Sequence, residues 1–566
     1  MLRGLAAAPG VAVGPVRLLE ESEPDAPFEG HERERERARR ALEDEARELG
    51  ARADRLRGEG LEGEADILAA NRMMALDPLL ASDVDELTER LTAAAALRLA
   101  AERHAALLAS LHDPVLAARA ADIRELGRRA ARRLATGLPP APSVEPSVLV
   151  ARDLGPADVA ELRESEQPIV GIALAGGAAT SHAAIMARSL GLPMLVGAGD
   201  ELLAAKEGTM LVVDGDAGLV YVEPSGEREA WGRTQMQQAA RARRRFARER
   251  ALPPVTRDGR WITLLGNAAT VVEVREGLAA EADGIGLLRT ELAFLDATDW
   301  PTEDEHVAAL TPLLELLRDR VATVRVLDFG EDKTPPFLAG TDRRGIELLL
   351  DHPDALAAQL RAILHAGRGC ELRVLVPLVE SPAQLRAVRA LLHEAAGGAA
   401  LPPLGAMIET PAAADRAHEI ALEADFFSIG TNDLVQYTLG LERSEPLATA
   451  RSAADPRVLR LVAATVTAAH DAGLSIEICG ESASVPELAA LYVGFGVDEL
   501  SVAPARTDEI RATVRRLSAS EAVAAAATSL EADSADEALA PARALLSGEG
   551  RDQQGELLGG RDGVVA

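Results

Sequence analysis

The spacing of apolar positions changes twice along the chain and divides it into three kinds of segment. Residues 1–20 hold short apolar runs broken by Pro and Gly, which predict one or two short strands. Residues 31–138 contain few glycines, and their apolar positions recur at i, i+3 and i+4, which predicts a bundle of four helices. Turns or helix starts are expected at Gly50, at 58–63, and at the Asp-Pro pairs 77–78 and 113–114.

A proline-rich segment at 138–146 separates this bundle from an α/β pattern. Short apolar runs typical of strands follow it, at 148–151, 168–171, 194–196, 210–213 and 219–222. The helical bundle is therefore predicted to be inserted into an α/β domain, after the first strands of that domain.

A second α/β pattern occupies the rest of the chain. Residues 225–250 are polar and helix-prone and predict a linker helix. After it, eight apolar runs alternate with helical segments, which predicts a (β/α)8 barrel with its active site at the carboxyl ends of the strands. The runs are 262–267, 284–289, 323–329, 372–379, 404–409, 426–432, 475–479 and 499–503.

The predicted fold class is therefore a multidomain α/β protein. Its expected parts are an α/β domain (1–30 and 139–224), an inserted helical domain (31–138), a linker helix (225–250), a barrel (251–530) and a partly disordered tail (531–566). The segments 138–146 and 225–254 are the natural hinges.

Composition narrows the possible functions. The chain has 566 residues, a formal net charge of −30 and 2% aromatic residues, which argues against binding nucleic acid or anionic membranes. Two cysteines, Cys370 and Cys479, form no disulfide framework, so a reducing, cytoplasmic compartment is expected. No run of about 18 apolar residues is present, so no membrane span is predicted.

The stretch from Gly176 to Arg188 carries the first candidate for chemistry. Its glycine pair opens a tight turn, Thr180 and Ser181 are natural N-cap residues, and helix formers follow. His182 is therefore expected in the first turn of a helix, where free backbone N–H groups and the helix dipole favour an anion. It is a candidate phosphoryl acceptor, and a capping or core histidine is the alternative.

Basic side chains collect where the predicted barrel strands end. Arg289, Arg325 and Arg443 have the fork geometry that clamps a phosphate or a carboxylate. Lys333 lies among acidic residues in a chain with only one other lysine, Lys206. It serves a phosphate, or it forms an ion pair that orients its loop.

Two carboxylates and a thiol follow other strands of the predicted barrel. Glu409 and Asp433 end two successive strands and predict a Mg²⁺ site, with structural caps as the alternative. Cys479 also ends a strand, and is a candidate proton donor or inert packing.

Several motifs lie far apart along the chain but follow one another in the family's order. In these motifs the chain resembles enzyme I of the bacterial phosphotransferase system, the phosphoenolpyruvate–protein phosphotransferase family. This family is one of the phosphoenolpyruvate (PEP)-utilising enzymes, a group that includes pyruvate phosphate dikinase. The motifs are Gly-Gly-x-x-Thr-Ser-His182, Gly-Ile-Gly-Leu-Leu-Arg289-Thr-Glu, Glu409-Thr-Pro-Ala-Ala-Ala, Asp425-Phe-Phe-Ser-Ile-Gly-Thr-Asn432-Asp433 and Cys479-Gly-Glu. The resemblance runs from about Gly4 to about residue 530.

The resemblance implies a reaction and a role for each matching residue. His182 would take a phosphoryl group from PEP, Glu409 and Asp433 would bind Mg²⁺, and Cys479 would protonate the enolate. The residues expected to contact PEP are Arg289, Arg325, Asn432, Arg443, Lys333 and Arg344.

The resemblance also implies partners. Residues 31–138 would dock the small phosphocarrier protein HPr for sugar uptake, the domain that carries His182 would swivel, and the PEP-binding barrel would form a homodimer. Ala70, Asn71 and Arg72 replace the more typical docking residues, so a regulatory phosphorelay with a different carrier protein stays as an alternative. A dikinase-type enzyme is a further alternative, but it needs a nucleotide-binding domain ahead of the first strands, and no P-loop precedes them.

Overall fold

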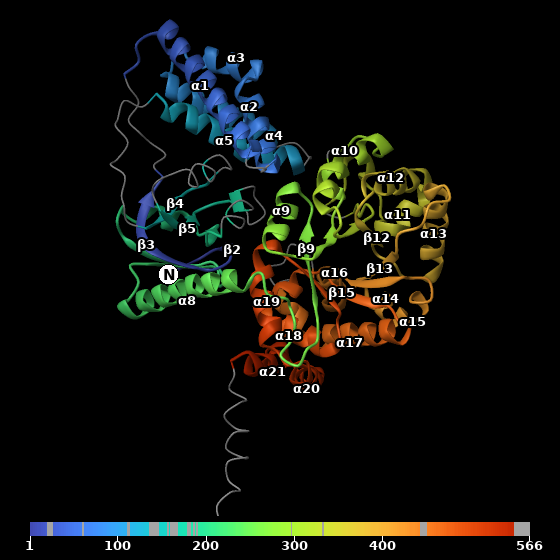
Figure 1. The fold of residues 1–566 in the computed structure, drawn as a ribbon. Helices are drawn as coiled ribbons and strands as arrows, with labels where there is room; N and C mark the ends of the chain where they lie inside the picture. Colours follow the sequence, from blue (N-terminus) through green and yellow to red (C-terminus); the bar gives the residue numbers. More distant parts are fainter. Residues whose placement is uncertain are drawn as a thin grey trace, which may run out of the picture. The chain divides into compact units, whose positions relative to one another are not determined.

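The computed structural model divides the chain into two compact units, Met1–Ala242 and Arg243–Ala566 (Figure 1). It describes residues 1–19, 27–58, 62–109, 114–134, 146–154, 158, 168–177, 183–184, 187, 191–295, 297–330, 333–441 and 450–547. Each unit has hydrophobic clusters of its own, and the two are described separately.

An eight-stranded sheet forms the α/β part of the first unit. Its order is β1-β8-β7-β3-β4-β5-β6-β2, with β3 to β6 parallel and β7 and β8 antiparallel. The strands are β1 (Leu2–Arg3), β2 (Leu5–Ala8), β3 (Val11–Leu18), β4 (Ser147–Ala151), β5 (Ile169–Leu174), β6 (Met194–Val196), β7 (Met210–Asp214) and β8 (Leu219–Val222). The first 20 residues thus form three strands rather than one or two, because turns at Gly4 and at Pro9-Gly10 separate runs that pair with different neighbours.

The inserted bundle has five helices rather than four. They are α1 (His31–Gly58), α2 (Glu62–Ala75), α3 (Pro78–Leu87), α4 (Ala93–Ala109) and α5 (Pro114–Arg132). Asp77 caps α3 through a bond from Leu79 N–H (2.8 Å), so the Asp-Pro pair does begin a helix as predicted. The turn expected at Gly50 is wrong, because α1 continues through it; the missing side chain makes room for Arg72 of α2, whose Cδ lies 3.2 Å from a Cβ built there.

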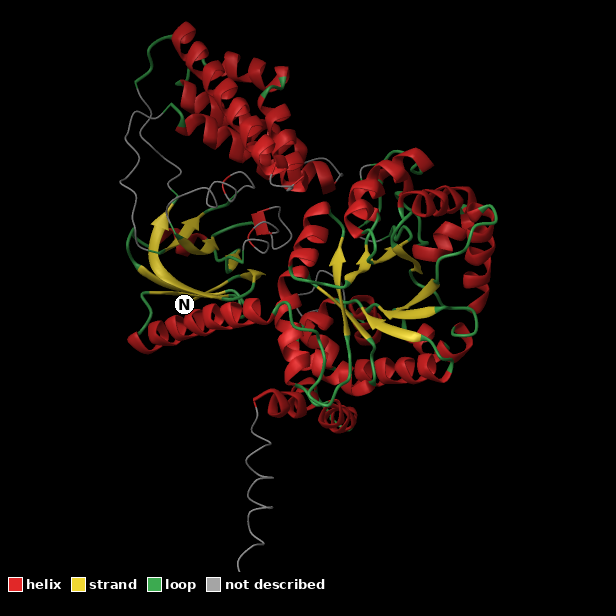
Figure 2. Ribbon diagram, in the orientation of Figure 1, coloured by secondary structure: helices red, strands yellow, loops and turns green. Residues whose placement is uncertain are grey.

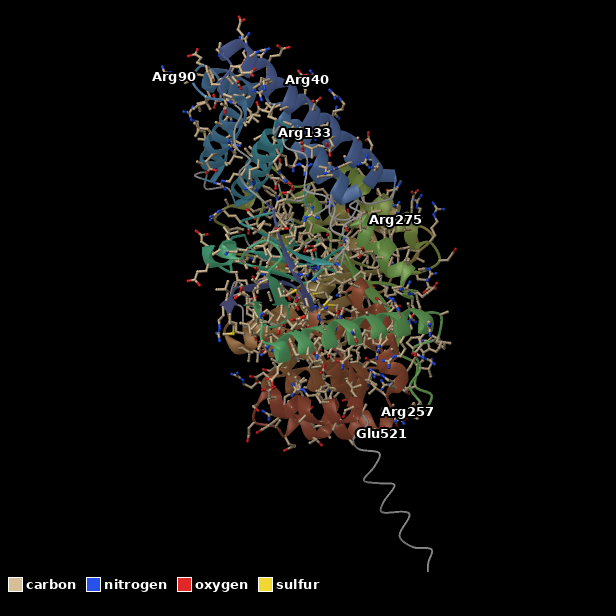
Figure 3. The ribbon with its side chains drawn as sticks, turned by 90° about the vertical axis from the view of Figure 1, so that its left-hand side faces the viewer. Arg40, Arg90, Arg133, Arg257, Arg275 and Glu521 are labelled. Carbon is tan, nitrogen blue, oxygen red and sulfur yellow. The ribbon has the colours of Figure 1, made fainter. Side chains whose placement is uncertain are left out.

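A buried ionic cluster joins this bundle to the α/β part of the same unit. Arg129 of α5 donates to Glu45 (2.6 Å) and to Asp158 (3.1 Å), and all three side chains are buried. Arg133, labelled in Figure 3, donates to Glu45 and Glu48. Removing one member of such a water-excluded cluster leaves an unpaired charge, which costs roughly 3–5 kcal/mol.

The predicted linker helix is α8 (Gly226–Glu249), which begins beside the sheet of the first unit (Figure 1). Val13 N–H, on β3, donates to Met236 Sδ at 3.0 Å. The first half of α8 is therefore fixed to the sheet that also carries the strands around the candidate histidine.

The second unit contains a closed barrel of eight parallel strands, as predicted. Figure 2 shows these strands enclosed by helices. In order they are β9 (Thr263–Ala268), β10 (Gly284–Leu288), β11 (Val321–Arg325), β12 (Glu371–Val376), β13 (Leu404–Ile408), β14 (Phe426–Ile429), β15 (Ser475–Ile478) and β16 (Glu499–Val502). β16 pairs with β9 and closes the barrel.

Helices follow the strands and cover the outside of the barrel. They are α9 (Val271–Ala279), α10 (Glu303–Leu314), α11 (Gly345–Asp351), α12 (Pro353–Ala366), α13 (Pro382–Ala396), α14 (Pro411–Asp415), α15 (Ala417–Ile420), α16 (Thr431–Leu439), α17 (Pro456–Asp471), α18 (Pro486–Phe495) and α19 (Thr507–Arg516). Among the described residues, no helix combines the length and apolar composition needed to cross a membrane.

Two more helices, α20 (Ala519–Leu530) and α21 (Ala535–Ser547), pack onto the barrel's hydrophobic core. Arg257 and Glu521, labelled in Figure 3, form an ion pair that ties α20 to the segment before β9. The predicted tail therefore contributes buried side chains to the barrel unit up to Ala542, whereas residues 548–566 lie outside the described residues.

Candidate active site

The carboxyl ends of the barrel strands bring together most of the polar residues that the sequence singled out. Arg289, Arg325, Lys333, Arg344, Glu409, Asn432, Asp433 and Cys479 all lie at or directly after β10 to β15. Two predicted site residues, His182 and Arg443, lie outside the described residues. The geometry below therefore concerns the barrel mouth, without Arg443.

Glu291 is the carboxylate at which two cations of the barrel mouth meet. Its Oε1 accepts from Arg325 Nη2 (2.6 Å) and from Lys333 Nζ (2.9 Å). Burial alone would raise the pKa of Glu291, but the charges of Arg325 and Lys333 outweigh it and lower the pKa to about 2. Glu291 is therefore ionised and fixes both cations in one place.

Asp328 is the second carboxylate among these cations. Its Oδ2 lies 3.1 Å from Arg325 Nη1 and 3.5 Å from Lys333 Nζ. Burial lowers the pKa of the Arg325 guanidinium, and the surrounding carboxylates more than offset this, so Arg325 keeps its charge. Lys333 thus forms ion pairs, which is one of the two roles that the sequence predicts for it. A bound phosphate would compete with these carboxylates for the same ammonium group.

Arg344 connects the loop after β11 to α16. Its Nη2 lies 3.1 Å from Asp433 Oδ1, and its Nη1 donates to the hydroxyl of Tyr437 at 2.9 Å. Asp433 and Tyr437 lie four residues apart on α16 and therefore face the same way. One guanidinium thereby bridges the candidate metal ligand and a half-exposed aromatic ring.

Glu409 and Asp433 form a carboxylate pair at the ends of β13 and β14. Glu409 Oε1 accepts from the Leu378 backbone N–H at 2.7 Å, which fixes its orientation. Burial raises the pKa of Glu409 well above its usual range, and the charges of Asp433 and Asp328 raise it further. A divalent cation between such mutually repelling oxygens would offset both effects, so the donor set fits one.

The number of carboxylates at this position matters for the kind of metal. In the described part of the chain, no three His, Cys, Asp or Glu side chains surround a common metal position. Mg²⁺ is usually held by one or two carboxylates together with waters and substrate phosphates. The two carboxylates could therefore hold a divalent cation of this kind.

Two further predicted residues line the same opening. Asn432 Oδ1 accepts from the Glu481 backbone N–H at 3.0 Å, which leaves its amide N–H groups for another acceptor. Arg289 is half-buried at the end of β10, and no described residue pairs with its guanidinium. Arg325 Nε is buried and also has no hydrogen-bond partner among the described residues. These donors favour an anionic ligand.

Cys479 lies at the end of β15 with its thiol almost fully buried. Its Sγ donates to the Ile429 carbonyl at 3.5 Å, and its own carbonyl accepts from Asn267 Nδ2 at 3.0 Å. Burial and the nearby charge of Glu477 raise the pKa of the thiol. Cys479 is therefore protonated in the resting protein, as a proton donor must be.

The segment that would carry His182 is known only from its flanks. Gly176 and Gly177 follow β5, and Gly177 has φ +86°, which places the turn where the glycine pair predicted it. Ala183, Ala184 and Ala187 are helical and buried in a cluster with residues of β2, β4, β5 and β6. These three described alanines are thus packed against the sheet.

Three residues at this site were not assigned roles from sequence. Glu291 and Asp328 follow strands β10 and β11, the same signal that selected Glu409. Their pairing with Arg325 and Lys333 depends on which strands are neighbours. Tyr437 carried no signal beyond its place four residues after Asp433.

Comparisons with known proteins agree with the geometry. The PEP-binding domain of PEP-utilising enzymes matches residues 243–519, the mobile domain matches 143–218, and the N-terminal domain matches 3–119. A multiphosphoryl transfer protein of Xanthomonas campestris is 35% identical over 94% of this chain and 66% of that protein.

Other relatives align with this chain over nearly the full length of both proteins. A phosphoenolpyruvate-protein phosphotransferase of Streptomyces coelicolor is 39% identical over 97% of this chain and 99% of that protein. A phosphoenolpyruvate-protein phosphotransferase of Geobacillus stearothermophilus is 33% identical over 95% of this chain and 96% of that protein. The chain therefore belongs to the PEP-utilising enzyme family, among the phosphoenolpyruvate–protein phosphotransferases.

Proposed function

We propose that this protein transfers the phosphoryl group of PEP to its own His182, releases pyruvate, and then passes the group to a small phosphocarrier protein of the HPr kind. The observation that carries this proposal is the barrel mouth, where Arg325 and Lys333 meet on Glu291 and Arg344 pairs with Asp433. Asp433 and Glu409 form the carboxylate pair beside these cations. The carrier step would make it the first enzyme of sugar uptake by a phosphotransferase system.

The cations at the mouth suit the charges of PEP, a phosphate ester that also carries a carboxylate. Before substrate binds, Glu291 and Asp328 neutralise Arg325 and Lys333, so the cluster is pre-positioned without a net excess of buried charge. A bound phosphate would share these cations. Phosphoryl transfer depends mainly on such positioning and charge neutralisation. The PEP-contacting set is Arg289, Arg325, Lys333, Arg344, Asn432 and Arg443.

The carboxylate pair is proposed to hold Mg²⁺. When bound, this ion neutralises charge on the phosphoryl oxygens of the substrate. Glu409 is held for this role by the Leu378 N–H, and Asp433 by Arg344. Removing divalent cations with EDTA should abolish transfer from PEP, and adding Mg²⁺ should restore it.

Loss of the phosphoryl group leaves pyruvate enolate, which needs a proton at C3. Cys479 is buried and protonated, at the end of the strand next to the one that precedes Asp433. Its S–H bond breaks as the C–H bond of pyruvate forms, and the sulfur becomes a thiolate. An acid in this position contributes roughly 10²–10⁴ to the rate of such a step.

The carrier protein is proposed to dock on the helical bundle at α2 and α3. Met73, Leu76 and Leu79 are exposed by 75%, 52% and 70%, although large apolar side chains are usually covered. Asp83 and Glu86 lie nearby on α3, so an apolar centre with an acidic rim would suit a basic partner. The proposal that HPr docks here is supported by this exposed face. It does not depend on Ala70, Asn71 and Arg72, which stand where more typical docking residues are expected.

The docking face is tested by Leu79→Asp, with Leu107→Asp on α4 as the control, because Leu107 is also exposed (63%). Leu79→Asp should weaken phosphoryl transfer to HPr at least tenfold while leaving self-phosphorylation from PEP unchanged. Leu107→Asp should affect neither. Equal transfer by both variants would place the docking face elsewhere.

The proposed function as a whole is tested with labelled PEP, Mg²⁺ and HPr from the same organism. Without HPr, pyruvate release should stop after about one equivalent per chain. With HPr, it should continue and the label should move to HPr. If the protein labels itself but HPr does not drain the label, the alternative of a regulatory relay with another carrier is favoured. The proposed homodimer through the barrel is tested separately by the mass in analytical ultracentrifugation.

A further inference from the structure

Arg344 at the barrel mouth divides its guanidinium between two residues of one helix. Its Nη2 lies 3.1 Å from Asp433 Oδ1, and its Nη1 donates to the hydroxyl of Tyr437 at 2.9 Å. Asp433 is the candidate metal ligand, whereas Tyr437 has no role in the reaction proposed above. The guanidinium therefore occupies one oxygen of the carboxylate that a metal ion would use.

A second arginine of the same barrel forms a tighter kind of ion pair. Arg373 donates to Glu499 through Nη1 (2.7 Å) and Nη2 (3.1 Å), a two-pronged pair that is strong and fixed in geometry. Arg344 instead donates to Asp433 through Nη2 and to Tyr437 through Nη1. The pair of Arg344 with Asp433 is therefore easier to release, because part of the guanidinium is already bound to an uncharged partner.

The base of the Arg344 side chain is fixed, although its guanidinium has this choice of partners. The Gly345 backbone N–H donates to the Phe329 carbonyl at 3.3 Å, which ties the residue after Arg344 to the end of the β11 segment. A Cβ on Gly330 would lie 2.5 Å from Arg344 Cβ, so the backbone packs closely there. A change of partner would therefore need rotation of the side chain without movement of the backbone.

The guanidinium of Arg344 and a metal ion on Asp433 would be competing cations. The side chains of Arg344 and Asp433 are 16% and 10% exposed, so water screens the repulsion between the two cations only weakly. A metal ion that binds Asp433 would therefore displace the guanidinium from this carboxylate. The groups that stay beside the guanidinium are Asp328, whose Oδ1 lies 4.0 Å from Nη2, and the hydroxyl of Tyr437.

Tyr437 offers the guanidinium a partner for which a metal ion on Asp433 does not compete. Its ring is half-exposed and belongs to the same helix as Asp433, four residues further on. The guanidinium carbon of Arg344 lies 5.9 Å from the centroid of this ring, within the range of a cation–π contact. The hydroxyl and the ring can therefore keep the guanidinium at the mouth after it leaves Asp433.

We propose that Tyr437 is a positioning residue: it holds Arg344 at the mouth when a metal ion takes Asp433, so that the released guanidinium meets the anionic substrate. This inference rests on the proposed function, in which Asp433 binds Mg²⁺ and Arg344 contacts PEP. Metal ion and PEP then bind cooperatively, because each takes one partner of an ion pair that is closed in the empty protein.

The first test needs no PEP. Mn²⁺ prefers the same oxygen ligands as Mg²⁺, and electron paramagnetic resonance measures its binding directly. Arg344→Gln removes the competing cation, so it should tighten Mn²⁺ binding to the substrate-free protein by about fivefold or more. Arg343→Gln is the matched control, because Arg343 pairs with the exposed Asp351 (3.0 Å), and it should bind Mn²⁺ as the wild type does. Unchanged or weaker Mn²⁺ binding by Arg344→Gln would overturn the inference.

The second test removes the hydroxyl and keeps the ring. In Tyr437→Phe, Mn²⁺ binding without PEP should be unchanged, because the lost hydrogen bond exists both before and after the metal binds. The KM for PEP should rise about tenfold with kcat nearly unchanged, since a hydrogen bond that positions a charged substrate contact is lost. In His182→Ala, which binds PEP without turnover, PEP should tighten Mn²⁺ binding, and adding Tyr437→Phe should weaken that effect about tenfold.

Tyr221 on β8 provides the control for this substitution, because the guanidinium carbon of Arg228 lies 4.4 Å from the centroid of its ring. Tyr221→Phe should change neither KM nor Mn²⁺ binding. A wild-type KM in Tyr437→Phe, or a kcat that falls by the factor by which KM rises, would overturn the inference, since the latter indicates a structural role. If the wild-type protein fails to accept the phosphoryl group, the proposed function fails instead, and the Mn²⁺ measurement without PEP distinguishes the two outcomes.

Discussion

At the scale of single residues, the barrel mouth depends on Glu291. One of its oxygens holds both Arg325 and Lys333, and neither the acid nor Arg325 is accessible to solvent beyond a few per cent. Buried charges of this kind stay ionised only while all partners are present. Glu291 therefore sets the position of two cations.

Replacing Glu291 with Gln removes the shared negative charge while keeping the size of the side chain. Arg325 and Lys333 would then repel each other, so we expect the free energy of unfolding to fall by roughly 3–5 kcal/mol and the KM for PEP to rise at least tenfold. Urea unfolding and steady-state kinetics measure the two effects. Glu303→Gln, which breaks the exposed pair with Arg361, is the control and should cost less than about 1 kcal/mol.

His306 predicts how stability changes with pH. It is fully buried on α10 against the ring of Phe294 (centroids 4.8 Å apart), and neither ring nitrogen has a partner among the described residues. Burial lowers its pKa from 6.5 to about 4. Between these values the unfolded chain binds the proton and the folded protein does not, so stability falls as pH is lowered from 6.5 toward 4.

The size of this loss of stability follows from the lowered pKa of His306. Between pH 7 and pH 5 this group should cost the folded protein about 2 kcal/mol. His306→Gln should remove that part of the pH dependence, so the difference in urea midpoints between the two proteins should change with pH. A constant difference would mean that His306 titrates normally.

The candidate residues could be found from sequence because each follows an apolar run. Glu409, Asp433 and Cys479 each end a strand, and a parallel barrel gathers such ends at one opening. The contacts between them could not be found in this way. The pairing of Glu291 with Lys333, and of Arg344 with Asp433, depends on loop paths that spacing does not determine.

At the scale of elements, the segment directly after β15 lies in close contact with the start of α16, which brings the thiol of Cys479 near the candidate metal ligand Asp433. Gly480 follows Cys479, and Thr431 begins the helix that carries Asp433. A Cβ on Gly480 would lie 1.7 Å from Thr431 Oγ1 and 2.8 Å from the Thr431 backbone nitrogen. Only a glycine allows the two segments to approach so closely.

Gly480→Ala should therefore separate these segments. We expect a loss of several kcal/mol in stability or a displaced Cys479, and in either case a fall of at least tenfold in PEP-dependent turnover. Gly226→Ala, at the open start of α8, has no atom within 4 Å of the new Cβ and should leave turnover unchanged. Thermal melting and turnover are the measurements, and normal turnover by Gly480→Ala would contradict this role.

Element type was easier to predict than element count. All eight barrel strands were found from their apolar runs, because strands buried on both faces are continuously apolar. The bundle was predicted with one helix too few, because no Gly or Pro marks the break between α3 and α4, from Leu87 to Ala93. A turn or helix start was expected at Gly50, but close packing against Arg72 accounts for this glycine instead.

At the scale of the whole molecule, each of the two units has its own hydrophobic clusters. The barrel and its C-terminal helices share one large cluster, whereas the bundle and the sheet have separate, smaller ones. The residues proposed to contact PEP lie in the second unit, and the candidate acceptor histidine lies in the first. The proposed reaction would therefore require the two units to meet, which is the role predicted from sequence for hinges at 138–146 and 225–254.

Separate cores predict separate unfolding. Calorimetry should resolve at least two transitions, and PEP with Mg²⁺ should raise only the one that belongs to residues 243–566. For His182→Ala, which binds PEP without turnover, a concentration of 100 times Kd should stabilise that unit by about 2.7 kcal/mol. An equal shift of all transitions would indicate one cooperative unit.

The most direct test of the central claim is to incubate the protein with PEP labelled in the phosphoryl group and Mg²⁺, then measure the label. We predict about one phosphoryl group per chain, stable to base and labile to acid as a phosphohistidine is, and absent from His182→Ala. Label retained by His182→Ala, or a label that survives acid, would contradict the account.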